Sequence, residues 1–280
     1  MKKITLYLIF SFGLAADYYV STTGHLQNNG SFNQPFLEIQ QCADITQPGD
    51  TCYIRQGQYH ENIIVNNKNG NSLNPLIFTN YNDERVVMNG TLPINSLWTP
   101  FNENIWETSI NFDIWQFFVN HEEMVMARWP NANFLDGSIW DKENHWAHGL
   151  IDEDDMAYQN GTMIDEPHGN ISLENIGFNI EGATAILNVG SFKTYSRKVL
   201  THNGATFTYD PVDLWKTKHH DYFLENKIEF LDTQGEWYYN PDSSKVYFWP
   251  YNNMNPNSLS IIGKTQSYAC LLYTSDAADE

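Results

Sequence analysis

The chain has 280 residues, 41% of them apolar and only 18% charged, so it can bury a substantial core and is not mainly disordered. Acidic residues outnumber basic residues 34 to 15, which gives a formal net charge of -19. Binding to nucleic acid or to an anionic membrane surface needs clustered Lys and Arg, so the composition argues against both partners. Aromatic residues make up 15% of the chain and favour strands, as in a secreted β protein.

The first sixteen residues have the pattern of a secretory signal. Lys2 and Lys3 precede an apolar run over residues 4–14, and Ala15-Ala16 supplies the small-residue exit. The run is too short to span a bilayer. We therefore expect a signal peptide over residues 1–16, no membrane insertion, and a secreted or extracytoplasmic protein, including the cell surface or the periplasm. The alternative is a buried first strand.

Residues 17–96 are predicted to form short strands around one helix. The helix begins after Pro35, and the turn at Pro48-Gly49 ends it. In an exported chain, Cys42 on this helix and Cys52 on the next strand predict a disulfide, with two separate buried thiols as the alternative. The predicted strands are residues 18–21, 51–55, 63–65, 76–79 and 85–88.

Three stretches in this part carry a resemblance to a known fold. They are residues 47–61 (QPGDTCYIRQGQYHE), 74–78 (NPLIF) and 86–90 (VVMNG). Together they resemble the first coils of the right-handed parallel β-helix (pectate-lyase-like) that many polysaccharide lyases and glycoside hydrolases share. The resemblance implies a short helix that caps the first coil, as residues 36–45 would do, because the open end of a solenoid exposes strand edges.

Residues 97–257 are predicted to form longer, aromatic-rich strands. Residues 114–131 and 235–250 resemble a β-rich module inserted into β-helix carbohydrate enzymes, and the second stretch reads as a hairpin with an Asn/Pro/Asp/Ser turn. Residues 258–269 would then return to the solenoid. The predicted fold is all-β: the first coils of a right-handed parallel β-helix with a capping helix, plus an inserted antiparallel β-rich module.

The last eleven residues, 270–280 (CLLYTSDAADE), resemble the in-frame translation of a sequencing adapter. We therefore expect this segment to have no specific place in the fold, and the natural chain to continue beyond Ala269.

No pair of catalytic carboxylates stands out. Glycoside hydrolysis needs two, on opposite sides of a sugar bond, and the spacing of Asp113, Glu122, Glu123 and the acidic run 152–155 isolates none. Glu122-Glu123 follows a predicted hairpin turn and reads as a solvated turn. The run 152–155 could bind calcium but lacks the spacing of a recognised loop. The catalytic residues stay unknown, and the resemblance implies that they lie mainly on later coils.

Histidines and tryptophans suggest a binding site rather than a metal site. His145, His148 and the pair His219-His220 lack the HExxH arrangement or a third ligand at a fixed distance, so we expect no zinc. Sugar rings stack on aromatic faces and need a few placed polar partners. Residues that could supply both are Arg128, Trp129, Trp140, His145 and Trp146. The alternative is that these tryptophans form the core of the inserted module.

The sequence therefore predicts a secreted protein acting on a polysaccharide or oligosaccharide, as a hydrolase or a lyase when full length. The alternative is a non-catalytic surface or adhesion protein that binds glycans with the same solenoid, because fold alone does not fix function.

Overall fold

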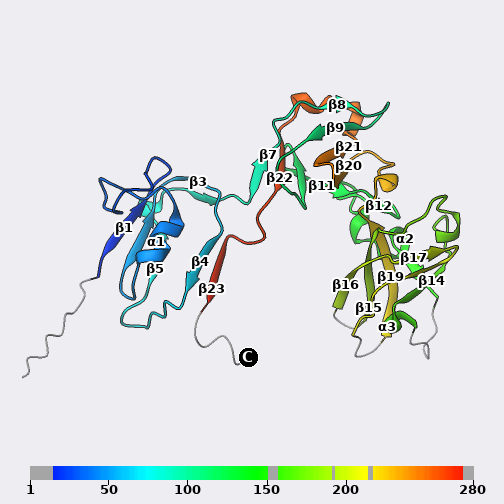
Figure 1. Cartoon of the computed structure of the whole chain (residues 1–280), viewed down its shortest axis with the longest axis horizontal. Helices are drawn as coiled ribbons and strands as arrows, with labels where there is room; N and C mark the ends of the chain where they lie inside the picture. The colour runs from blue at the N-terminus through cyan, green and yellow to red at the C-terminus, as the bar shows by residue number, and fades with distance from the viewer. Residues whose placement is uncertain (1–14, 151–156, 191–192, 214–216, 274–280) are drawn as a thin grey trace, which may run out of the picture. The chain divides into compact units, whose positions relative to one another are not determined.

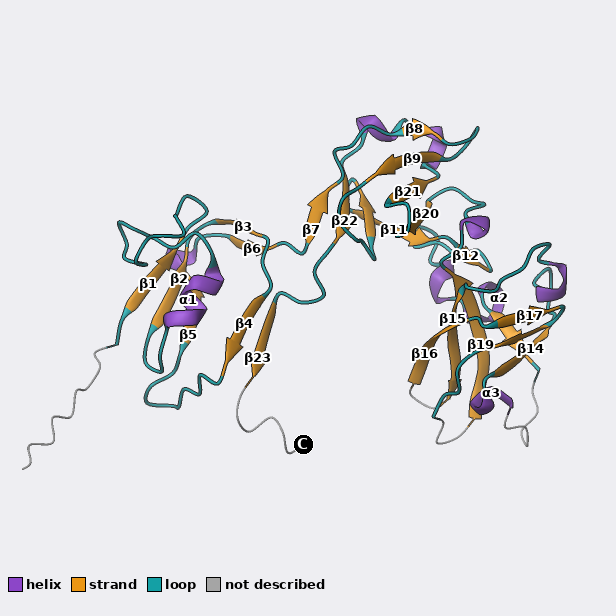
Figure 2. Cartoon of the chain, viewed as in Figure 1, coloured by secondary structure: helices purple, strands orange, loops and turns teal. Residues whose placement is uncertain are grey.

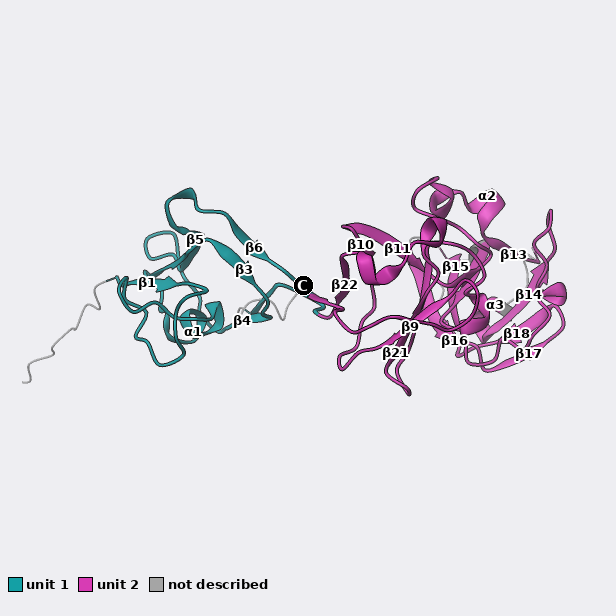
Figure 3. Ribbon diagram, turned by 90° about the horizontal axis from the view of Figure 1, so that it is seen from above, with its two compact units in different colours: residues 1–91, 266–280 teal, residues 92–265 magenta. Residues whose placement is uncertain are grey.

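The structure is a computed structural model that describes residues 15–150, 157–190, 193–213 and 217–273. Strands and loops dominate, and the helices are short (Figure 2). The chain divides into two compact units, unit 1 with residues 1–91 and 266–280 and unit 2 with residues 92–265 (Figures 1 and 3). The prediction of an all-β protein is confirmed. Within the described ranges, no helix has the length and apolarity needed to cross a membrane.

The strands of unit 1 pair only in parallel among the residues described. They form one sheet in the order β1-β2-β5 and two pairs, β3-β6 and β4-β23. The consecutive strands β2, β3 and β4 therefore lie beside β5, β6 and β23 in turn. The bounds are β1 Asp17–Val20, β2 Thr51–Ile54, β3 Gly57–Tyr59, β4 Ile63–Asn66, β5 Ile77–Asn80, β6 Val86–Met88 and β23 Cys270–Tyr273, with a 3-10 turn at Tyr81–Asp83.

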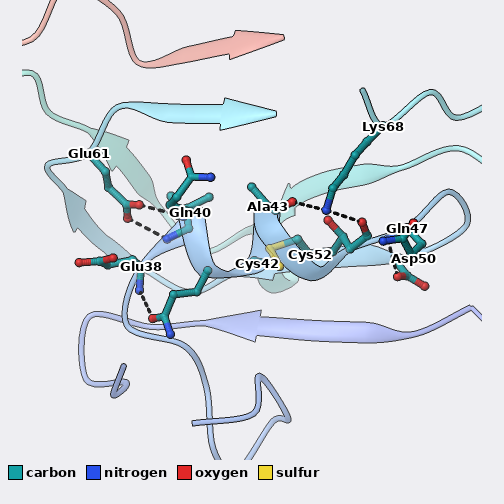
Figure 4. The surroundings of a disulfide bond; sticks show 12 residues. Glu38, Gln40, Cys42, Ala43, Gln47, Asp50, Cys52, Glu61 and Lys68 are labelled. Atoms are coloured by element: carbon teal, nitrogen blue, oxygen red, sulfur yellow. Dashed lines mark hydrogen bonds between the residues drawn. A yellow bond between two sulfur atoms is a disulfide. The ribbon is translucent and has the colours of Figure 1, made fainter. Parts of the chain in front are cut away.

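The predicted helix is α1, Ile39–Ile45, which buries Ile39, Cys42 and Ala43 in the core of unit 1. The predicted disulfide is confirmed, since Cys42 is bonded to Cys52 of β2 (Figure 4).

Two charged side chains satisfy the ends of α1. The Glu61 carboxylate accepts the N–H groups of Ile39 and Gln40 at 2.8 and 3.0 Å. The Lys68 ammonium donates to the carbonyls of Ala43, Asp44 and Thr46 at 2.6–2.7 Å (Figure 4). The first N–H groups and the last carbonyls of a helix have no partner within it, so the residues around β4 complete a helix of only two turns.

The first sheet of unit 2 has eight strands in the order β7-β22-β10-β11-β20-β21-β9-β8. It is mixed, because β11 and β20 pair in parallel while β10 and β11 are antiparallel. One face packs on a core that includes Phe117, Trp237 and Phe248. The bounds are β7 Thr91–Pro93, β8 Thr99–Pro100, β9 Trp106–Ser109, β10 Phe117–Val119, β11 Glu122–Met126, β20 Glu236–Asn240, β21 Lys245–Phe248 and β22 Ile261–Lys264.

The second sheet of unit 2 is antiparallel and runs β16-β15-β19-β13-β14-β18-β17, with β12 also paired to β19. Its core includes Leu187, Phe207 and Tyr222. The bounds are β12 Arg128–Trp129, β13 Ala147–Gly149, β14 Thr162–Glu166, β15 Thr184–Gly190, β16 Lys193–Lys198, β17 Thr201–Asn203, β18 Thr206–Thr208 and β19 Thr217–Glu225. Helices α2 Lys142–His145 and α3 Ala157–Asn160 and 3-10 turns at Ser138–Trp140, Leu173–Asn175, Ile228–Phe230, Tyr251–Asn253 and Pro256–Ser258 complete the unit.

Both hairpins predicted in this part are present. Strands β10 and β11 are joined by Asn120 and His121, whose φ angles of 50° and 74° are those of the two-residue turn that suits a twisted hairpin. Strands β20 and β21 are joined through Pro241–Ser244, with Asn240 opposite Lys245.

Two segments differ from their predicted places. Of residues 258–269, predicted to return to the solenoid, Ile261–Lys264 form β22 and pair with β10 in unit 2, and the chain re-enters unit 1 only from Gln266 on. The prediction that residues 270–280 have no place in the fold is wrong for Cys270–Tyr273, which form β23 beside β4. Backbone pairing does not depend on side chains, and β23 buries few of them: Leu272 is 68% exposed. The predicted signal run 4–14, the acidic run 152–155 and residues 274–280 lie outside the described residues.

Candidate functional site

A cleft of about 180 Å³ in unit 2 combines aromatic and charged side chains. It is bounded by the hairpin β10–β11, by β12, and by the end of β19. Its aromatic lining is Trp115, Phe134, Phe223 and Trp237, and its polar lining is Gln116, Glu123, Arg128 and Glu225.

Strand alternation explains the wall formed by the hairpin. Phe117, Val119 and Met124 are buried in the core of the first sheet. Side chains of neighbouring residues in a strand point to opposite faces. Gln116, next to Phe117, and Glu123, next to Met124, therefore face away from this core and line the cleft. The Gln116 amide donates to one Glu123 carboxylate oxygen at 2.7 Å. Glu122 is exposed as predicted, but both glutamates lie in strand β11 rather than in the turn, and Glu123 is only partly exposed and lines the cleft.

The opposite wall follows the same rule. Tyr222 and Leu224 of β19 are fully buried, so Phe223 and Glu225 emerge on the other face. Strand β12 pairs with this end of β19 and places Arg128 opposite Glu225. A cation, a carboxylate and an aromatic ring therefore meet at one end of the cleft.

Arg128 is a buried structural cation. It is 1% exposed, and its guanidinium donates to the carbonyls of Pro130 and His145 at 2.9 and 3.0 Å. The guanidinium carbon lies 3.8 Å from the centroid of the Phe223 ring, a cation–π contact. Burial lowers the pKa of Arg128 to about 10, while Glu225 and Glu236 oppose this shift. Arg128 thus stays charged at neutral pH.

Glu225 is the open polar group of the cleft. Burial raises the pKa of its carboxyl, and the charge of Arg128 opposes that effect. Among the residues that the structure describes, no hydrogen bond reaches this carboxylate, and the two Arg128 groups that donate hydrogen bonds, Nε and Nη2, bond to the carbonyls of Pro130 and His145 instead. A half-buried carboxylate without donors is costly, and a ligand with hydroxyl groups can supply them.

Glu236 lies behind the cleft and is 1% exposed. Its two oxygens accept the backbone N–H groups of Arg128 and Asp232, both at 3.3 Å. Burial raises the pKa of Glu236 to about 8 despite these bonds. It is therefore mainly protonated at neutral pH and ties β20 to β12.

The five residues predicted for sugar contact fall in different environments. Arg128, His145 and Trp146 lie together, since the Arg128 guanidinium donates to the His145 carbonyl at 3.0 Å and lies 5.9 Å from the centroid of the buried Trp146 ring. Trp129 packs partly against the core of the second sheet. Trp140 is 78% exposed and is not among the residues lining the cleft. The alternative of tryptophans as module core fits Trp146 best.

Sequence reasoning missed Trp115, Phe223 and Glu225. A signal was present in the alternation Tyr222-Phe223-Leu224-Glu225, which assigns the second and fourth residues to one face. Nothing in the sequence linked that face to Trp115, more than a hundred residues earlier.

Metal binding finds no support within the described part of the chain. No group of three or more His, Cys, Asp or Glu side chains there could hold an ion. His148 stacks on His168 with 3.8 Å between ring centroids rather than joining His145. The run 152–155, proposed for calcium, is outside the described residues.

Comparisons with known proteins relate the chain to carbohydrate enzymes. Residues 209–251 match the family described as GH141 insertion domain. They include the cleft-lining residues Phe223 and Glu225 of β19 and Trp237 of β20. "Uncharacterized protein YwoF" of Bacillus subtilis (strain 168) is 36% identical over 83 residues, which are 29% of this chain and 18% of YwoF. "Pectate lyase PEL9" of Emericella nidulans is 34% identical over 84 residues, 29% of this chain and 20% of that protein.

Among solved structures, one called "Glycoside hydrolase" superposes with a TM-score of 0.65 at 17% identity, covering 91% of this chain and 47% of that one. The chain thus shares a fold with that structure. It spans about a fifth of the curated relatives that it matches.

Proposed function

We propose that this chain belongs to a secreted polysaccharide-active protein and that the cleft of unit 2 binds the glycan. The observation that carries the proposal is the cleft itself, where aromatic faces and the open Glu225 carboxylate meet. Sugar rings offer apolar faces for stacking and hydroxyl groups for hydrogen bonding. The match of residues 209–251 to the GH141 insertion domain supports this assignment.

We propose further that unit 1 forms the first coils of a right-handed parallel β-helix, with unit 2 inserted into it. The parallel pairing of β2, β3 and β4 with β5, β6 and β23 supports stacked coils. The ends of the insertion support it too, because the Ile94 N–H donates to the Ile261 carbonyl at 2.9 Å, so that the chain leaves unit 2 close to where it enters. The Cys42–Cys52 disulfide supports export.

Affinity electrophoresis through gels that contain soluble polysaccharides tests the proposal. We expect retardation by at least one glycan and its loss in Trp115→Ala, because Trp115 is 41% exposed in the cleft lining. Trp140→Ala, the same change outside the lining, should leave retardation intact. Unretarded migration in every gel would reject the proposed function.

Turnover assays separate the enzyme from the binding-only alternative. Release of reducing ends indicates a hydrolase, and unsaturated-uronate absorbance indicates a lyase. Retardation without either product would show that this chain binds glycan without a complete catalytic site, which fits both the non-catalytic protein and an enzyme whose catalytic residues lie on later coils.

A further inference from the structure

We infer that the cleft of unit 2 selects neutral sugars and rejects uronates, an inference that rests on the proposed function. Its polar lining holds two carboxylates, Glu123 and Glu225, and one cation, Arg128. The relative named as a pectate lyase matches only 29% of this chain. The excess of carboxylates in the cleft should repel an acidic sugar.

Arg128 does not offer a site for a sugar carboxylate. It is 1% exposed, its Nε and Nη2 groups donate to the carbonyls of Pro130 and His145, and its guanidinium lies on the Phe223 ring. Recognition of a carboxylate by arginine depends on the free, planar fork of N–H donors. Because Arg128 is only 1% exposed, that fork is not accessible from the cleft, and a uronate would meet Glu123 and Glu225 without an exposed cation to compensate.

A neutral sugar satisfies the same groups. The Glu225 carboxylate has no hydrogen-bond donor among the described residues, and Glu123 is bonded to Gln116 at only one of its oxygens. An ionised carboxylate accepts several hydrogen bonds, so two adjacent hydroxyl groups match Glu225. Trp115 and Phe134, 41% and 37% exposed, offer ring faces for the apolar side of the sugar.

Isothermal titration calorimetry of the full chain at pH 7.5, which measures dissociation constants, tests the inference with two sets of oligosaccharides. The neutral set is xylohexaose, mannohexaose and cellohexaose, and the acidic set is hexagalacturonate and hexamannuronate. We expect at least one neutral hexasaccharide to bind at least tenfold more tightly than either uronate. Glu225→Gln should weaken the affinity for neutral hexasaccharides about tenfold, since a charge-assisted hydrogen bond becomes a neutral one. It should also reduce the ratio between the affinities for neutral sugars and for uronates.

Glu174→Gln is the matched control, because Glu174 is an exposed carboxylate outside the cleft lining, and it should change neither affinity. Uronates that bind as tightly as neutral sugars, or a preference unchanged in Glu225→Gln, would overturn the inference and leave the proposed function standing. Binding of neither set would overturn the inference, and the gel assay would then decide the proposed function separately.

Discussion

Arg128 has the chemistry of a ligand-binding residue and the surroundings of a structural one. Two carbonyls and the rings of Phe223 and Trp146 contact its guanidinium, and within the described residues it makes no direct ion pair. Its charge still acts on Glu225, whose pKa it lowers against the effect of burial. Arg128 therefore fixes the positions of the residues at this end of the cleft, and it is too buried to contact a ligand directly.

Arg128→Met should lower the free energy of unfolding by about 2 to 4 kcal/mol, since two carbonyls lose their donor in a buried place. Urea denaturation followed by tryptophan fluorescence measures the loss. The exposed Arg85→Met is the control and should change stability by less than about 0.5 kcal/mol. Equal effects of the two substitutions would contradict the structural role of Arg128.

Glu236 predicts a pH dependence of stability. Its pKa rises from 4.5 in the unfolded chain to about 8 in the fold, so its contribution is fully present below pH 4.5 and is lost as pH rises through about 8. The slope is about 1.4 kcal/mol per pH unit within that window. Glu236→Gln, a neutral side chain of the same shape, should remove this part of the slope in unfolding measured from pH 5 to 9. Parallel pH profiles of wild type and variant would refute the assignment.

At the scale of elements, α1 depends on bonds from outside itself. Glu61 and Lys68 satisfy its two ends, and the Cys42–Cys52 disulfide fixes it to β2. An isolated helix of this length is unstable in water, so these contacts and the buried face account for its presence.

Replacing both Cys42 and Cys52 by Ser should destabilise unit 1 by about 2 to 3 kcal/mol through loop-closure entropy. Alkylation of the unreduced native protein should modify one thiol, that of the exposed Cys270. Cys270→Ser should leave stability unchanged. Alkylation at Cys42 or Cys52 without reductant would contradict the bond.

The elements that the sequence predicts well are those with local signals. The hairpins at Asn120-His121 and Pro241–Ser244 carry their turn residues with them. The pairing of β22 with β10 was not predicted, because it joins segments about 140 residues apart in the sequence and has no local sequence signal. The cleft was missed for the same reason, since it joins β10–β11 to the end of β19. Burial of Arg128 was equally invisible, because a lone Arg is usually exposed.

At the scale of the whole molecule, the two units differ in structure and in proposed role. The strands of unit 1 pair in parallel around α1, which supports the proposed first coils of a β-helix, and unit 2 holds the cleft. The proposed function therefore depends on whether glycan binds to the cleft of unit 2.

Hydrogen–deuterium exchange with and without the tightest glycan of the titration set tests this most directly. Bound glycan should slow exchange in residues 115–126 and 223–225, the two walls of the cleft, and leave β1 to β6 of unit 1 unchanged. Unchanged exchange in both walls at saturation, or protection confined to unit 1, would contradict the account.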